Sequence, residues 1–146
     1  MGQQQLLLLV LSTVIVGLAT VAGIQAFDEN QQQATQDAMV QRGTTIISDI
    51  KAGLSKPEQL GGITYGATEK NVTEQLGYND GSDAVISVEG ASANVKCELG
   101  LDSGNSKAVV LCGDGVSDVQ KVSVTLNASG NGEVSTAFGS NAVSLP

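Results

Sequence analysis

Side chains that can perform covalent or acid-base chemistry are scarce in this sequence. Its 146 residues include two cysteines and no histidine. A Ser-His nucleophile is therefore excluded, and the usual general acid-base group near neutral pH is missing. We expect no enzymatic activity from this chain.

The two cysteines, Cys97 and Cys112, lie on either side of the turn-forming stretch LDSGNS at residues 101–106. A hairpin that pairs them also pairs Leu99 with Val110 and Leu101 with Ala108. A metal or redox site is disfavoured because there is no histidine and no Cys-x-x-Cys spacing. Since the cysteines follow a long uncharged N-terminal segment, residues 3–27, of a kind found in exported proteins, we expect a disulfide. Such a bond contributes about 3 kcal/mol in the chain-entropy model.

Two short acidic stretches contain carboxylates that can ligate a hard cation. Asp80 and Asp83 flank Gly81-Ser82, and Asp114 and Asp118 flank Gly115-Val116-Ser117. Neither spacing matches the EF-hand loop, and Asp-Gly clusters usually form turns. We expect no resident cofactor, with Ca²⁺ at these four aspartates as the alternative.

Two positions fit the acceptor pattern for N-glycosylation. They are Asn71, in Asn-Val-Thr, and Asn127, in Asn-Ala-Ser. Both are candidate glycan sites on an exported domain, and chance occurrence in an Asn-, Ser- and Thr-rich region is the alternative.

The composition restricts both the partners and the core. Seven basic residues stand against fifteen acidic ones, which argues against binding to a nucleic-acid backbone. There are two Phe, two Tyr and no Trp, so the core of one small domain has to come from Val, Ile, Leu and Ala.

The N-terminal stretch of the sequence, residues 3–27, has an unusual composition. It contains no Asp, Glu, Lys or Arg, and the first charge is Asp28. As a helix rising ~1.5 Å per residue, Leu6 to Phe27 can span a hydrocarbon core of ~30 Å. A cleaved secretory signal is a poor match, because it needs a positive n-region and a shorter apolar core.

Small residues follow a regular spacing within this stretch. Thr13, Gly17 and Thr20 recur at intervals of four and three, and Ala19 and Gly23 form a small-xxx-small pair. Small residues allow helix backbones to approach closely, which favours packing against other helices. The alternative is a plain membrane anchor, because such residues are common in membrane helices.

The chain turns polar after Phe27 without any turn cluster, so we expect the helix to continue. Its apolar residues then recur at helical spacing, at Ala38 or Met39, Ile46, Ile47, Ile50 and Leu54. Pro57 and Gly61-Gly62 supply the end, whereas Gly43 is a weak point inside the helix. We predict one helix from Gln3 to Leu54, with its rear half on the chain's own sheet.

From Gly61 onward, apolar residues alternate with polar ones in short segments separated by turn residues. The predicted strands are 63–65, 84–88, 95–101, 108–112, 119–126 and 133–138. The fold class is therefore α+β, a long hydrophobic-then-amphipathic helix packed on a C-terminal antiparallel sheet. The expected divisions are a leader at 1–2, a hydrophobic helix at 3–27, its amphipathic continuation at 28–56 and a β head domain at 57–146.

Four features follow one another along the chain: Gly2, an uncharged helix directly after it, an amphipathic continuation, and a Gly-rich β domain with two cysteines. This arrangement resembles the type IV pilin family. The resemblance implies that a prepilin peptidase cuts after Gly2 and leaves Gln3, often methylated, as the first mature residue. The Gly-Gln junction also resembles archaeal leaders, so the resemblance leaves open whether the origin is bacterial or archaeal. Two departures are the missing Lys or Arg before Gly2, and Leu7 where the family usually has Glu.

The resemblance implies a structural subunit of an extracellular type IV pilus-like filament that polymerises with its own copies through the N-terminal helix. The subunit would lie in the cytoplasmic (inner) membrane before assembly and at the cell surface afterwards. Its other partners would be the prepilin peptidase and the pilus assembly machinery. A minor pilin, a secretion pseudopilin, and a membrane-anchored exported domain that never polymerises are the alternatives. Secretion pseudopilins also use Ca²⁺ in this part of the fold.

Overall fold

The computed structural model describes residues 2–78, 84–91, 94–115, 121–127 and 132–145. The chain divides into two compact units, Met1–Ala34 and Thr35–Pro146. Its elements form an α+β fold, in which a long N-terminal helix is followed by an antiparallel sheet of five strands, as the sequence predicts.

Helix α1 runs without interruption from Gly2 to Leu54, and the predicted helix is confirmed. No proline occurs before Pro57, so no residue inside α1 lacks the amide hydrogen that the helix needs. Beyond Leu54 the chain forms a tight loop with a single 3₁₀ turn, η1 (Glu58–Leu60). Gly61 ends this turn with a φ of 77°, a left-handed conformation that favours glycine.

The first unit is a single helical stretch, and its described residues, 2–34, are all exposed. Among the described residues, α1 is the one helix whose length and apolar composition are sufficient to cross a membrane.

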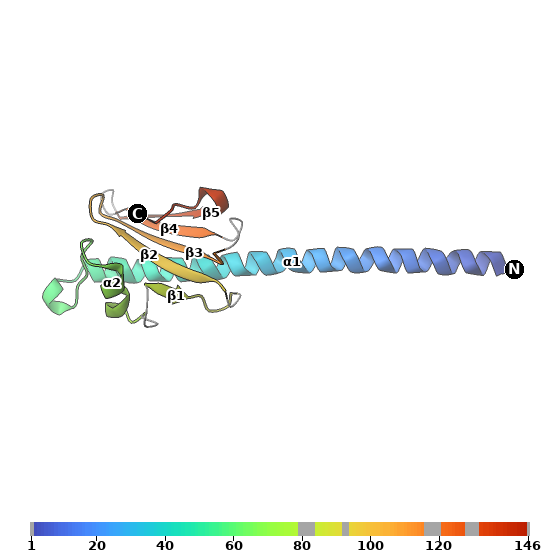
Figure 1. Ribbon diagram of the computed structural model, residues 1–146, viewed down its shortest axis with the longest axis horizontal. Helices are drawn as coiled ribbons and strands as arrows, with labels where there is room; N and C mark the ends of the chain where they lie inside the picture. Colours follow the sequence, from blue (N-terminus) through green and yellow to red (C-terminus); the bar gives the residue numbers. More distant parts are fainter. Residues whose placement is uncertain (1, 79–83, 92–93, 116–120, 128–131, 146) are drawn as a thin grey trace. The chain divides into compact units, whose positions relative to one another are not determined.

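The second unit contains a five-stranded meander in which each strand pairs with the next along the chain, β1-β2-β3-β4-β5 (Figure 1). The strands are β1 (Val85–Ser87), β2 (Lys96–Asp102), β3 (Lys107–Gly113), β4 (Val122–Asn127) and β5 (Glu133–Phe138). All four pairings are antiparallel.

The core of this unit lies between the inner face of the sheet and residues 35–54 of α1. Met39, Ile46, Ile47 and Ile50 are fully buried on the helix, at the spacing of one helical face. The helix approaches β4 closely at Gly43, where a Cβ atom would lie 2.7 Å from Val124 Cγ2. The expected packing of the rear half on the sheet is thus confirmed.

Two predicted elements differ in the structure. Residues 63–65 form a loop and not a strand. Ile63 in this loop is buried in the core, and its backbone amide donates to the Gly53 carbonyl at 3.2 Å. A short helix, α2 (Glu69–Gln75), occupies a region where only strands and turns were expected. Its two buried residues, Val72 and Thr73, span too short a segment to show a helical period in the sequence. The first residues of predicted strand 119–126 lie outside the described residues, and β4 begins at Val122.

The C-terminal segment returns to the outer face of the sheet after the 3₁₀ turn η3 (Gly139–Asn141). The Gly139 amide donates to the Lys121 carbonyl (2.8 Å), and the Val143 amide donates to Ser123 Oγ (2.9 Å). Ser123 and Thr125 are buried on this face, although they alternate with core residues along β4.

Candidate functional site

Among the described residues, most of the exposed large apolar side chains belong to the first unit of the chain. Leu6, Leu18 and Phe27 expose 65–68% of their surface, and no charged side chain interrupts residues 3–27. The other exposed large apolar residues of this surface are Leu7, Leu8, Leu9, Val10, Leu11, Val14, Ile15, Val16, Val21 and Ile24. A contiguous apolar surface made of so many large side chains is typical of a site that contacts a membrane or another protein. We refer to residues 6–27 as the apolar face.

The hydroxyl groups on the apolar face bond within their own helix. Ser12 Oγ donates to the Leu9 carbonyl (2.9 Å), and Thr13 Oγ1 donates to the Val10 carbonyl (2.8 Å). Thr20 Oγ1 donates to the Gly17 carbonyl at 2.8 Å. Because these donors are already bonded, their burial in lipid or among other helices leaves no hydroxyl hydrogen unsatisfied.

Gly17 and Gly23 make no close packing contact with the described part of the chain. A Cβ atom built at either position meets no heavy atom within 4 Å, whereas at Gly53 it would lie 2.7 Å from Ile63 Cγ1. Glycine inside a helix costs about 1 kcal/mol relative to alanine. A close approach by another helix would account for glycine at these positions.

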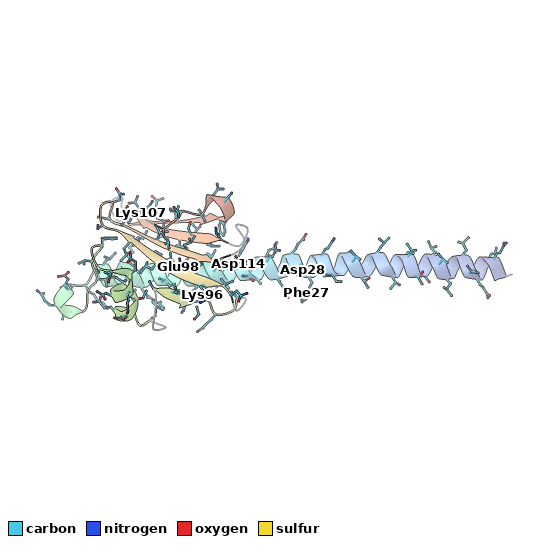
Figure 2. The ribbon with its side chains drawn as sticks, viewed as in Figure 1. Phe27, Asp28, Lys96, Glu98, Lys107 and Asp114 are labelled. Carbon is cyan, nitrogen blue, oxygen red and sulfur yellow. A yellow bond between two sulfur atoms is a disulfide. The ribbon has the colours of Figure 1, made fainter. Side chains whose placement is uncertain are left out.

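The structure brings only part of the predicted packing stripe together. Thr20 and Gly23 line one shallow depression with Ile24, Phe27 and Asp28, and Figure 2 labels the last two on α1. Thr13, Gly17 and Ala19 lie on the same helix outside this depression.

The predicted processing site lies at the beginning of α1. Gly2 is the first helical residue, and Gln3 follows it with an exposed side chain. Met1 lies outside the described residues.

Cys97 and Cys112 form a disulfide, and both are completely buried. They face each other across β2 and β3, with Leu99 opposite Val110 and Leu101 opposite Ala108. The register predicted from the cysteine spacing is confirmed.

Of the four candidate Ca²⁺ ligands, only Asp114 falls within the described residues, while Asp80, Asp83 and Asp118 lie outside them. Asp114 lines a shallow depression on the outer face, where Figure 2 labels it with Lys96 and Glu98. The described part of the chain holds no group of three His, Cys, Asp or Glu residues placed to bind a metal.

The two candidate glycosylation sites are both exposed at their asparagines. Asn71 lies on α2, and its acceptor threonine, Thr73, is buried with its hydroxyl donating to the Lys70 carbonyl at 2.9 Å. Asn127 ends β4, and the rest of its acceptor pattern lies outside the described residues.

A polar cluster that we did not predict joins α1 to the segment after α2. The Tyr78 hydroxyl donates to Asp49, and the Arg42 guanidinium lies 5.1 Å from the centre of the Tyr78 ring. The pKa of Tyr78 is raised to about 12. Burial is the main cause, and the hydrogen bond to Asp49 is the second. Arg42 and Asp49 are seven residues apart, so they lie about two turns apart on the same face of α1. This spacing is the feature of the sequence that could have indicated the cluster. The cluster therefore holds the segment after α2 against α1.

The comparisons with known proteins add no family to this description. No protein-family model, curated protein or solved structure matches the chain. Among the described residues, the surface that stands out for binding is the apolar face.

Proposed function

We propose that this chain is the structural subunit of an extracellular type IV pilus-like filament, in which the apolar faces of many copies pack together. One observation carries the proposal. The same uninterrupted helix, α1, supplies an exposed and uncharged surface at residues 6–27 and a buried part of the core at residues 35–54. A single element thus links an assembly surface covalently to a folded head.

The energetics favour a membrane as the place where assembly starts. Each of the large side chains on the apolar face costs about 1.5–3 kcal/mol when it is left in water, so an isolated subunit needs lipid around it. Lipid removes that cost, and association then depends on close packing, to which Gly17 and Gly23 contribute. Repetition of one head-to-tail contact that does not close generates an open helical polymer.

The resemblance of Gly2 and the following helix to type IV pilins supplies the remaining steps of the proposal. A prepilin peptidase processes the chain between Gly2 and Gln3 in the cytoplasmic membrane. The assembly machinery then extracts the subunit, and the head becomes part of the filament surface outside the cell.

Two other functions each have an observation in their favour. Leu7 occupies the position where major subunits of the resembled family usually have Glu, which favours a minor pilin or a secretion pseudopilin. The length and apolar character of α1 are also sufficient for a single-pass anchor of an exported domain that does not polymerise.

The test is to shear cells that express the chain, view the released material by electron microscopy, and determine its intact mass and N-terminal sequence. Thin fibres whose main protein begins at Gln3 are expected. Fibres in which this chain is scarce beside another subunit would favour the minor-subunit function. A chain that stays in the membrane fraction with Gly2 intact would contradict the filament proposal.

A further inference from the structure

The disulfide lies beneath the rear part of α1. Cys97 and Cys112 belong to the inner face of the β2–β3 hairpin, and neither exposes any surface. A Cβ atom built on Gly43 would lie 3.8 Å from Cys112 Sγ, so the helix backbone passes directly over this sulfur.

The same part of α1 is held down on both sides of Gly43. Met39, Ile46 and Ile47 are fully buried in the core cluster that also contains both cysteines. Thiol-disulfide exchange requires a third sulfur to touch one of the two bonded sulfurs, and its rate depends on access. While residues 35–54 lie on the sheet, such an approach is blocked.

We propose that residues 35–54 of α1 act as a lid over the Cys97–Cys112 bond, which closes and reopens only while this segment is away from the sheet. Folding then has an order in which the hairpin is oxidised first and the helix docks second. The hairpin suits this order, because its cysteines are only 15 residues apart and its strands pair directly around one turn.

The oxidant is a protein or small molecule of the thiol-disulfide exchange class. The thiolate of one cysteine attacks the oxidant's disulfide, which forms a mixed disulfide and releases one oxidant thiolate. The second cysteine thiolate then attacks the mixed disulfide and releases the other oxidant sulfur. Two cysteines are oxidised, the oxidant is reduced to a dithiol, and the two cysteine protons pass to the released thiolates.

The first test measures reduction of the oxidised full chain in detergent micelles by dithiothreitol, with thiol labelling and mass spectrometry. Under native conditions, reduction is expected to be at least ~100-fold slower than in the same protein unfolded with urea, since it waits for a rare opening. Native and unfolded proteins that react at similar rates would overturn the lid.

The second test uses two glycine variants of the same helix. Gly43→Ala places a Cβ atom 2.7 Å from Val124 Cγ2, whereas Gly23→Ala meets nothing within 4 Å. Gly43→Ala is expected to accelerate native reduction roughly fivefold because overpacking weakens docking. Gly23→Ala is expected to keep the original rate.

Hydrogen exchange at amides 35–54, measured in the same samples, reports helix opening independently of the disulfide. Ile47→Ala, which removes fully buried side-chain contacts, serves as a second variant where Gly43→Ala leaves exchange unchanged. Faster helix exchange without faster reduction, in either variant, would show that α1 does not guard the bond.

Discussion

Tyr78 is a single residue whose ionisation is coupled to the stability of the head. Burial and the hydrogen bond to Asp49 raise its pKa to about 12, whereas an unfolded chain has a tyrosine pKa of about 10. The folded protein therefore holds this proton more tightly. Its contribution to stability is complete below pH ~10 and is lost as the pH rises towards ~12.

Tyr78→Phe should lower the free energy of unfolding by about 1 kcal/mol near neutral pH, because it removes a hydrogen bond to a carboxylate that is partly exposed. The difference from the original protein should shrink between pH ~10 and ~12. Urea unfolding at a series of pH values, with the disulfide intact, measures both effects.

Tyr65→Phe is the matched control for this prediction. The Tyr65 hydroxyl is buried and has no hydrogen-bond partner within the described part of the chain. Its removal should leave stability equal or slightly higher. A Tyr78→Phe variant as stable as Tyr65→Phe would show that the bond to Asp49 contributes nothing.

Gly43 is required by the distance between α1 and β4. Alanine there would gain about 1 kcal/mol of helix propensity but would press against Val124, a buried and stiff side chain, at a cost of about 1–3 kcal/mol. We expect Gly43→Ala to destabilise the head by about 1 kcal/mol in urea unfolding. Gly17→Ala, which meets no atom within 4 Å, should not, and equal stability of the two variants would contradict this packing account.

At the scale of elements, the β2–β3 hairpin depends on a turn that one carboxylate organises. Asp102 accepts hydrogen bonds from the Asn105 side chain (2.7 Å) and from the Gly104 amide (3.0 Å). The Asn105 side chain is the main cause that lowers the pKa of Asp102. The bonded carboxylate therefore stabilises the turn above pH ~4, and this contribution disappears as the pH falls through the lowered pKa.

Asp102→Ala should lower the unfolding midpoint at pH 7, and its difference from the original protein should diminish in acid. Ser103→Ala, in the same exposed turn, is the control for loss of a polar side chain. Urea midpoints at several pH values test the prediction, which fails where the Asp102 and Ser103 variants show the same pH dependence.

Elements with a long periodic pattern, or with turn residues on both sides, were predictable from the sequence. Helix α1 shows an uncharged run and then a buried face of 3.6-residue period, and β5 was predicted with its observed bounds. Helix α2 was missed because it has only seven residues, two of them buried. The apolar residues at 63–65 imitated a strand, although contact with Gly53 holds Ile63 in a loop.

The candidate site was predictable in its type more than in its details. The absence of charge along residues 3–27 is a property of composition, and it identified the apolar face directly. Contacts between distant segments were beyond the sequence, because the cluster of Arg42, Asp49 and Tyr78 depends on where α2 ends. The spacing of small residues likewise does not decide which of them face a partner.

At the scale of the whole molecule, charge and apolar surface are separated along the chain. All seven basic residues lie in residues 35–146, and the full chain has a net charge of −8. Copies of such a chain repel one another at low salt. In the proposed filament, the attraction between copies would therefore come from the uncharged apolar face.

Gly17→Leu tests this attraction with the fold expected to stay intact, because in the described part of the chain the added Cβ atom meets nothing within 4 Å beyond its own helix turn. Filaments should be lost from sheared material, since a leucine keeps neighbouring helix backbones apart. The head should unfold at the same urea concentration, within about 0.5 kcal/mol of the original stability.

Ile15→Leu is the control for filament loss, since it keeps the side-chain volume and lies about 160° away from Gly17 around the helix, at 3.6 residues per turn. It should leave filaments intact. Loss of filaments in both variants would indicate a general sensitivity of membrane insertion. Normal filaments from Gly17→Leu would place the helix contacts elsewhere, because a close approach at Gly17 has no room for a leucine. The remaining glycine of the apolar face, Gly23, would then be the next position to enlarge, since it lines the depression with Thr20 and Phe27.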